Sequence, residues 1–435
     1  MIHNRHCDNA LSKGERNLSI QSQIQSRKQN LKAKKKSEVV VFINPDLLAL
    51  ITKNEAKVRV KKSFADHYLY FCGTVFYLKY GNKKFKDTEH VPINSMLMRS
   101  LISQRHYDMI LLNLESWGVI SVNKSYSSGK KSKSFKLNPQ YCKEVKAYRI
   151  KDKTIISKVL NFRRKKMKII QSLPEPYQYL QMTSSWLNID EKKAIEYNIR
   201  NYSTDVDQYK FNSNFYAINA LSTGNTHFSV DTFGNRAHSN LTNLSSELRP
   251  FLSVDNVSLG EIDIKNSQPL FFYLAIKDQP GISEKEKETY RQLVENASFY
   301  EFFMEEFKIP SEKRDQVKVK VLTEIFFNKN KPYETKFFKH FKKSFPDIAR
   351  FIRKVKKEDY TNMARLLQRA ESKFVIEKAV ARFIQRFGQG YEYISTIHDS
   401  IVVKKDRIPE TLDLVLECFR EEGIKPQVKK NYFEP

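Results

Sequence analysis

Two stretches rich in β-forming residues, far apart in the chain, each carry an aspartate where a buried strand would normally exclude charge. VSLGEIDI at residues 257–264 places Asp263 near the end of a predicted strand. YISTIHDSIVV at residues 393–403 places Asp399 between two short predicted strands. Because an unpaired buried charge costs free energy, these two positions need either a structural or a chemical explanation.

The structural explanation is local at each position. Asp and Ser favour turns, so HDS at residues 398–400 can be a polar turn that joins two strands. Asp263, at a strand end, can cap a helix that follows it.

The chemical explanation joins the two aspartates. Carboxylates on adjacent strands can hold two divalent cations about 3.5–4 Å apart, and such a pair of ions suits phosphoryl transfer. Mg²⁺ prefers oxygen ligands and keeps several waters, so two protein carboxylates suffice. If Asp263 and Asp399 meet in the fold, we expect two Mg²⁺ ions, with Mn²⁺ as a substitute.

The charge balance points to a polyanionic partner. Lys and Arg number 76 against 49 Asp and Glu, which gives a formal net charge of +27. Such an excess indicates nucleic acid, with an anionic membrane surface as the alternative. No stretch approaches the roughly 18 apolar residues that span a bilayer, and MIHNRHCDNA lacks the apolar core of a signal peptide. We expect no membrane partner.

The cysteines indicate a reducing compartment. Cys7, Cys72, Cys142 and Cys418 are far apart and form no CxxC pair. Their spacing predicts neither a zinc site nor a disulfide framework, so the thiols fit a reducing cytoplasm.

The N-terminal third predicts a basic arm followed by a small domain. Residues 1–37 are polar, end in KAKKKS, and predict a disordered arm that contacts phosphates. Residues 38–140 predict two helices and then a basic β-hairpin, the outline of a winged helix-turn-helix, which binds DNA through a helix in the major groove. The hairpin lysines placed to meet the backbone are Lys124, Lys130, Lys131 and Lys133. The alternative is a winged helix that contacts only protein.

The rest of the chain divides at about residue 226. Residues 141–225 predict mostly helices, with a basic stretch RRKKMKII, as a thumb-like or connecting region. Residues 226–435 predict an α+β unit that contains both aspartates.

This last unit resembles the family A DNA polymerases and their relatives, the phage-type single-subunit RNA polymerases. The matching stretches occur in the family's order, and they are FGNRAHSNLTNLSSELRPFL, EIDIKNSQP, RDQVKVKVLTEIFFN, RLLQRAESKFVIEKAVARF, IHDS and PQVKKNYFEP. The resemblance implies a right-hand palm and fingers over 226–435, preceded by the winged-helix-like domain and the helical region.

The resemblance also implies roles for individual residues. Asp263 and Asp399 would be the catalytic metal ligands. The nucleotide-binding residues would be Arg314 and Lys318 on the triphosphate, Phe326 stacked on the incoming base, and Gln268 beside the sugar. The residues at the primer–template would be Arg236, Asn243, Arg249, Gln368 and His398.

Several positions depart from the family's pattern. Gln268 stands where a Glu helps DNA polymerases exclude the ribose 2′-hydroxyl, so we expect a preference for dNTPs that is smaller than in Glu-bearing relatives. Phe326 replaces a Tyr, and Phe327 replaces the Gly that commonly follows it. Lys320 is an alternative to Lys318, and HDS is more typical of RNA-making relatives.

The sequence therefore predicts an α+β, template-directed nucleotidyltransferase. We expect a DNA-dependent DNA polymerase of a phage, plasmid or mobile element that uses dNTPs, primer–template and duplex DNA, with replication proteins of the same element as further partners. The alternatives are a single-subunit RNA polymerase or primase, and a non-catalytic DNA-binding replication initiator.

Overall fold

The computed structural model describes residues 38–57, 63–123, 132–202, 207–329, 334–388 and 392–434. The predicted basic arm, residues 1–37, lies outside these ranges, as do Lys124, Lys130 and Lys131 of the predicted hairpin. Over the residues that the structure describes, no helix combines the length and the hydrophobicity needed to cross a bilayer.

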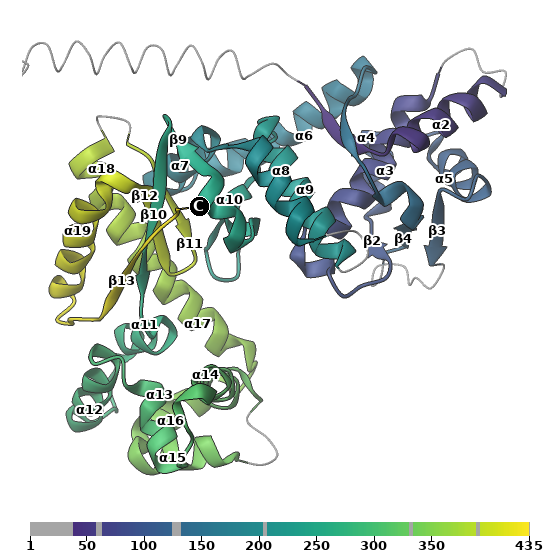
Figure 1. Cartoon of the computed structure of the whole chain (residues 1–435). Coiled ribbons are helices and arrows are strands. Elements are labelled where there is room, and N and C mark those ends of the chain that lie inside the picture. The colour runs from purple at the N-terminus through teal and green to yellow at the C-terminus, as the bar shows by residue number, and fades with distance from the viewer. Residues whose placement is uncertain are drawn as a thin grey trace, which may run out of the picture.

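The N-terminal module lies to the right in Figure 1 and has its own hydrophobic core. Its helices are α2 (Pro45–Lys57), α3 (Ala65–Tyr80), α4 (Ser95–Leu101) and α5 (Tyr107–Ser116). A three-stranded antiparallel sheet in the order β2 (Val91–Pro92), β4 (Ser134–Leu137), β3 (Ile120–Asn123) covers them. The helix, helix, hairpin order predicted from the sequence is present. Strand β1 (Val40–Ile43) pairs with β5 (Lys146–Arg149), so the module extends past residue 140.

A group of helices links this module to the central sheet. They are α6 (Lys153–Gln171), α7 (Glu175–Thr183), α8 (Glu191–Asn201) and α9 (Gln208–Ser222). The prediction of a helical region holds, but the region is not a separate layer. The short strand β6 (Asn188–Ile189) pairs with β9 (Leu252–Val254) and thereby belongs to the central sheet.

The central sheet is antiparallel and positions both aspartates. Its order is β11 (Ile394–Ile397), β12 (Ser400–Lys404), β10 (Val257–Ile264), β9 and β6, and β13 (Val428–Tyr432) also pairs with β10. Strand β12 is buried along its whole length, as its run of β-branched residues indicates. Helix α19 (Ile408–Glu421) packs against β10 and β12. The hairpin of β7 (Phe228–Val230) and β8 (Ala237–Ser239) lies near β11.

A helical lobe hangs below the sheet in Figure 1. After α11 (Ser267–Ile276), which follows β10, its elements are α12 (Glu284–Glu295), α13 (Phe299–Glu306), α14 (Arg314–Val321), a π-helical turn at Leu322–Phe327, α15 (Lys336–Ser344) and α16 (Pro346–Val355). Helix α17 (Thr361–Ser372) returns to the sheet, and a π-helical segment (Lys373–Val380) and α18 (Ala381–Phe387) complete the chain before β11. Buried aromatic rings such as Phe272, Tyr290 and Phe299 pack against one another in the core of the lobe.

Candidate active site

Asp263 and Asp399 meet on adjacent strands of the central sheet. Asp263 stands on β10 directly opposite Ser400 of β12, and Asp399 immediately precedes Ser400. The Ser400 hydroxyl donates a hydrogen bond of 3.0 Å to Asp263 Oδ1. His398 and Asp399 form the tight turn between β11 and β12, with His398 at a φ of 55°. The turn reading and the catalytic reading of HDS are therefore compatible, because the turn is what places Asp399 beside Asp263.

The electrostatics of Asp263 show that the two carboxylates oppose each other. Burial, and then the negative charge of Asp399, raise the pKa of Asp263 above its usual value. The Ser400 hydrogen bond and the positive charges of Lys318 and Lys429 act in the opposite direction. Like charges held close in a partly buried site favour the binding of a cation that neutralises both.

The carboxylate oxygens of Asp263 and Asp399 fit a Mg²⁺ ion whose other ligands are waters and phosphate oxygens of a substrate. Among the described residues, His, Cys, Asp and Glu do not gather in threes around a possible metal position. A site with two carboxylates leaves most ligand positions of a divalent cation to waters and phosphate oxygens, which is how Mg²⁺ commonly binds in phosphoryl-transfer sites. Asp263 and Asp399 are the residues that would hold it.

Helix α14 faces the carboxylates with positive charge. Lys318 is exposed, and its charge acts on Asp263. Lys320, also exposed, is not among the charges that act on Asp263, which favours Lys318 as the residue that faces the site. Arg314 lies 2.5 Å from Glu301 Oε1 through its Nε, and its guanidinium lies 5.4 Å from the centre of the Tyr300 ring. The charges of Arg314 and Asp399 both act on Tyr300, so this buried ring lies near both the helix and the carboxylates.

Phe326 lies in the core of the lobe and not at an open surface. Its side chain is fully buried, with its ring centre 5.0 Å from that of Phe272 and 6.5 Å from that of Phe299. The expected stacking on an incoming base does not fit this placement, because the ring has no exposed surface. The π-helical turn at the end of α14 directs the Phe326 side chain inward.

Hydrogen bonds from α17 hold the tip of the β7–β8 hairpin. Arg369 donates from Nε to the Phe233 carbonyl at 3.1 Å, and the Ser372 hydroxyl donates to the Gly234 carbonyl at 2.8 Å. A Cβ on Gly234 would lie 2.6 Å from Cβ of Gln368, so glycine is needed for this approach. Gln368, expected at the primer strand, is partly exposed and packs on the hairpin.

A buried carboxylate that the sequence analysis missed joins three elements. Glu371, 1% exposed, accepts from Arg236 Nε at 2.8 Å on Oε1 and from the Arg236 terminal nitrogen at 2.5 Å on Oε2. Gln268 Nε2 donates to the same Oε2 at 2.8 Å. Burial, together with the charge of Asp399, raises the pKa of Glu371 above its usual value, although the hydrogen bonds from Arg236 and Gln268 act in the opposite direction. The available signal was the spacing, since Glu371 lies three positions after Gln368 and shares its helix face.

The other expected primer–template residues lie around the same sheet. Arg249 NH1 is 3.1 Å from Glu261 Oε2, and Glu261 stands two positions before Asp263 on the same face of β10. Asn243, at the end of α10 (Asn240–Asn243), is exposed. The exposed His398 ring lies 6.2 Å from His238 in an edge-to-face arrangement. No interaction of Asn243 or His398 defines a ligand, so their roles stay predictions.

In the predicted DNA-binding module, the helix that would enter a major groove lacks the positive charge that the hairpin carries. Helix α5, which would enter a major groove, has the sequence YDMILLNLES without Lys or Arg, and its Leu112 is 65% exposed. Arg99 of α4 is bound to Asp108 of α5 at 2.6 Å. Lys133 of the hairpin is partly exposed. DNA binding by this module stays a prediction that rests on the hairpin lysines, three of which lie outside the described residues.

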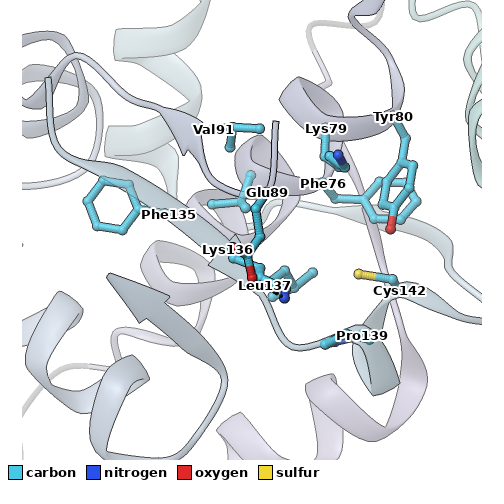
Figure 2. A pocket seen from close by; sticks show the side chains of 11 residues that line it. Phe76, Lys79, Tyr80, Glu89, Val91, Phe135, Lys136, Leu137, Pro139 and Cys142 are labelled. Carbon is cyan, nitrogen blue, oxygen red and sulfur yellow. Dashed lines mark hydrogen bonds and ion pairs between the residues drawn. The ribbon is translucent and has the colours of Figure 1, made fainter. Parts of the chain in front are cut away.

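A small cavity in the same module is separate from the carboxylates. It measures about 70 Å³ and lies between α3 and β4, lined mainly by apolar side chains such as Phe76, Val91 and Leu137 (Figure 2). Tyr80 and Cys142 lie beside each other at its edge, and burial raises the pKa of the Cys142 thiol to about 11. Ligand pockets usually measure roughly 300–1,000 Å³. This cavity is too small for a nucleotide.

Comparisons with known proteins add a similarity in structure only. No family model matches the chain, and no curated protein matches it. One similar solved structure is the POL domain of Pol1 from M. smegmatis, in complex with DNA primer-template and dNTP. The match has 11% sequence identity and a TM-score of 0.37, and it covers 90% of this chain and 66% of that chain. This chain thus spans just under two thirds of the length of that chain. The TM-score is too low to support a conclusion about function, which rests on the site alone.

Proposed function

We propose that the protein is a template-directed nucleotidyltransferase, and specifically a DNA polymerase that extends a primer with dNTPs. The observation that carries the proposal is the meeting of Asp263 and Asp399 on adjacent strands, opposite the cationic face of α14. Opposed carboxylates bind divalent cations, and cations opposite them attract a polyphosphate. In this proposal the sheet is the palm, and α12–α16 are the fingers.

Each residue of the site has a task in this reaction. Bound divalent cations would neutralise charge on the phosphoryl oxygens and activate the attacking hydroxyl. Asp263 and Asp399 hold them, and the Ser400 hydroxyl fixes the orientation of Asp263. Lys318 meets the phosphates as a mobile point charge. Arg314, held by Glu301, is the more rigid of the two cationic groups.

The distribution of positive charge supports a nucleic acid partner. Helix α6 carries a run of exposed basic residues, Arg163, Arg164, Lys165, Lys166 and Lys168. Burial, and then the positive charge of Lys166, lower the pKa of His227, which lies next to the β7–β8 hairpin. Primer–template duplex that leaves the carboxylates along this hairpin would meet α6. Replication proteins of a phage, plasmid or mobile element are the further partners that we propose.

A second candidate activity is RNA synthesis by a single-subunit RNA polymerase or primase. The observation that favours it is Gln268, which supplies a neutral amide beside the site where a carboxylate would repel or crowd a 2′-hydroxyl. The third possibility is a non-catalytic replication initiator. Such a protein would not need Asp263 beside Asp399, so the pairing of the two aspartates does not favour it.

Primer extension with dNTPs or NTPs separates these possibilities. We expect the wild type to extend a primer with dNTPs and Mg²⁺. Asp263→Asn and Asp399→Asn should each lower the rate about a thousandfold or more, because a metal ligand supplies several kcal/mol of transition-state stabilisation. Both variants should still bind duplex DNA. Extension at the wild-type rate by either variant would refute the assignment, and extension with NTPs alone would select the RNA-making activity.

A further inference from the structure

Strand β10 has a partner strand on each side at Asp263. Ser400 of β12 lies opposite Asp263 on one side, and Lys429 of β13 lies opposite it on the other side. Residues that lie opposite each other in an antiparallel pair point to the same face of the sheet, with their Cβ atoms about 4.5–5.5 Å apart. The side chains of Ser400, Asp263 and Lys429 therefore form one row across the open face of the sheet.

A hydrogen bond further along β13 confirms which of its side chains share this face. Asn431 lies opposite Glu261, and its Nδ2 donates to Glu261 Oε1 at 3.0 Å. Because side chains alternate along a strand, Lys429 points to the same face as Asn431. Lys430 lies opposite the buried Ile262 and points to the other face. The two adjacent lysines are both exposed, but only Lys429 shares a face with the carboxylate.

The ammonium group of Lys429 is available to a ligand. Within the described part of the chain, its side chain forms no ion pair, although its positive charge acts on Asp263. The charge of Lys318 acts on the same carboxylate from α14, so two cationic side chains approach Asp263 from different elements. An uncompensated ammonium beside a carboxylate that binds divalent cations suits an anion that also binds those cations, which is the chemistry of a polyphosphate.

The direction of the reaction indicates which phosphate group would meet Lys429. In nucleotidyl transfer, the 3′-hydroxyl oxygen of the primer bonds to the α-phosphorus and its proton passes to water. The bond to the β-phosphate oxygen breaks, and its electron pair stays on the leaving pyrophosphate. The attacking and leaving oxygens lie roughly in line, on opposite sides of the phosphorus. Asp399 and the β7–β8 hairpin, where the proposed primer lies, are on the β12 side of β10. The leaving group then points to the β13 side, where Lys429 stands.

We propose that Lys429 binds the pyrophosphate that leaves the nucleotide held beside Asp263 and Asp399. This inference rests on the function proposed above. The same phosphate chemistry has a second source, because the backbone of the primer–template also carries phosphate groups. The experiment therefore compares pyrophosphate with primer–template.

Inorganic pyrophosphate with Mg²⁺ is the probe for the first source. Its binding to the full chain is measured by calorimetry, and its inhibition of single-nucleotide insertion is measured in parallel. Lys429→Ala should weaken both by about tenfold or more, the usual effect of losing a hydrogen bond between charged groups. Lys429→Arg should stay within about threefold of the wild type, because it keeps the positive charge.

The adjacent lysine supplies the matched control. Lys430→Ala removes the same charge from the same exposed strand, but from the opposite face of the sheet. It should leave pyrophosphate binding and inhibition within about twofold of the wild type. A difference between the two alanine variants therefore reports the position of the charge and not the net charge of the protein.

Primer–template affinity over a range of salt concentrations tests the second source. We expect Lys429→Ala to leave the slope of log affinity against log salt unchanged. A loss of about 0.9 from this slope, with pyrophosphate binding unchanged, would assign Lys429 to a backbone phosphate and overturn the proposal.

Failure of this proposal and failure of the proposed function give different results. If Lys429→Ala and Lys430→Ala bind pyrophosphate equally well while the wild type extends primers, the role of Lys429 is refuted and the polymerase activity stands. A wild type that neither extends a primer nor binds pyrophosphate overturns both proposals.

Discussion

The ionised carboxylate of Asp263 lowers the stability of the metal-free folded protein. Burial and a neighbouring negative charge both raise the pKa of Asp263, so its ionised form is less stable in the folded state than in the unfolded chain. Sites that gather like charges are a common reason why active-site residues oppose stability. Glu371 differs in that Arg236 compensates its charge directly, although burial still raises the pKa of this carboxyl above its usual value.

The stability of the metal-free protein should therefore rise when Asp263 is neutralised. A carboxyl whose pKa is raised by folding favours the folded state below its unfolded pKa, near 3.8, and loses that contribution as pH rises through the folded value. At pH 7 with a chelator, we expect Asp263→Asn to melt roughly 1–3 °C above the wild type. The difference should vanish near pH 3.

Mg²⁺ provides the control for this prediction. A cation that binds only the folded state stabilises it by mass action. Mg²⁺ should raise the melting temperature of the wild type and leave that of Asp263→Asn nearly unchanged. A variant that melts below the wild type at pH 7 in chelator would show that Asp263 stabilises the fold, contrary to the raised pKa.

Lys318 and Lys320 form a matched pair on α14. Both are exposed lysines in the last turn of the helix, but only Lys318 acts on Asp263. We expect Lys318→Ala to raise the apparent Km for the nucleotide about tenfold and to slow insertion, because one charge-assisted contact to phosphate is lost. Lys320→Ala should stay within twofold of the wild type. Steady-state insertion kinetics of both variants test this prediction. A larger effect of Lys320→Ala than of Lys318→Ala would show that Lys320 is the residue that faces the nucleotide.

At the scale of elements, the site depends on how the β7–β8 hairpin docks on α17. The hairpin delivers Arg236 and the helix delivers Glu371, so the ion pair forms only if the two elements approach closely. The approach is closest at Gly234, whose Cα faces Gln368. The close packing of this joint explains why a residue with no chemistry of its own is needed next to the functional arginine.

The substitution Gly234→Ala tests the contact between the β7–β8 hairpin and α17. The added methyl would meet Gln368 Cβ at 2.6 Å, a distance at which one element must shift. Overpacking of this kind typically costs about 1–3 kcal/mol, measurable by chemical denaturation, and it should also reduce insertion because Arg236 moves with the hairpin. Adding Gln368→Gly should restore part of both losses. Wild-type stability of Gly234→Ala would show that the hairpin is free to move.

The contact between the β7–β8 hairpin and α17 also shows which parts of the site could be predicted from the sequence. The strand pair that unites Asp263 with Asp399 was predictable, because runs of β-formers interrupted by a charge are rare and the alternation of β10 leaves Asp263 on the open face. Glu371 was missed because its partner Arg236 lies 135 positions away, and its spacing from Gln368 places it on a helix face without showing that the carboxylate is buried. Phe326 was expected at the nucleotide, but the π-helical turn, invisible in residue spacing, rotates it into the core.

At the scale of the whole molecule, the position of the positive charge matters more than its total. The net charge of +27 predicts affinity for any polyanion, but a track for duplex requires charge beside the carboxylates. Helix α6 meets this condition. The charge of its Arg163 acts on Tyr70 of the N-terminal module, and that of its Lys166 acts on His227 beside the β7–β8 hairpin. The helical lobe also exposes lysines, on α15, but they lie at its far end.

This geometry predicts that three charges on α6 contribute to DNA binding and three on α15 do not. The α6 variant replaces Arg164, Lys165 and Lys168 with Gln, and the control replaces Lys336, Lys339 and Lys343, all exposed on α15. Each phosphate contact contributes about 0.9 to the slope of log affinity against log salt. Primer–template affinity, measured by fluorescence anisotropy over a range of salt concentrations, should lose about 2 to 3 from that slope in the α6 variant only. Because both variants remove the same net charge, equal slopes would mean that the total charge, and not the α6 track, holds the duplex.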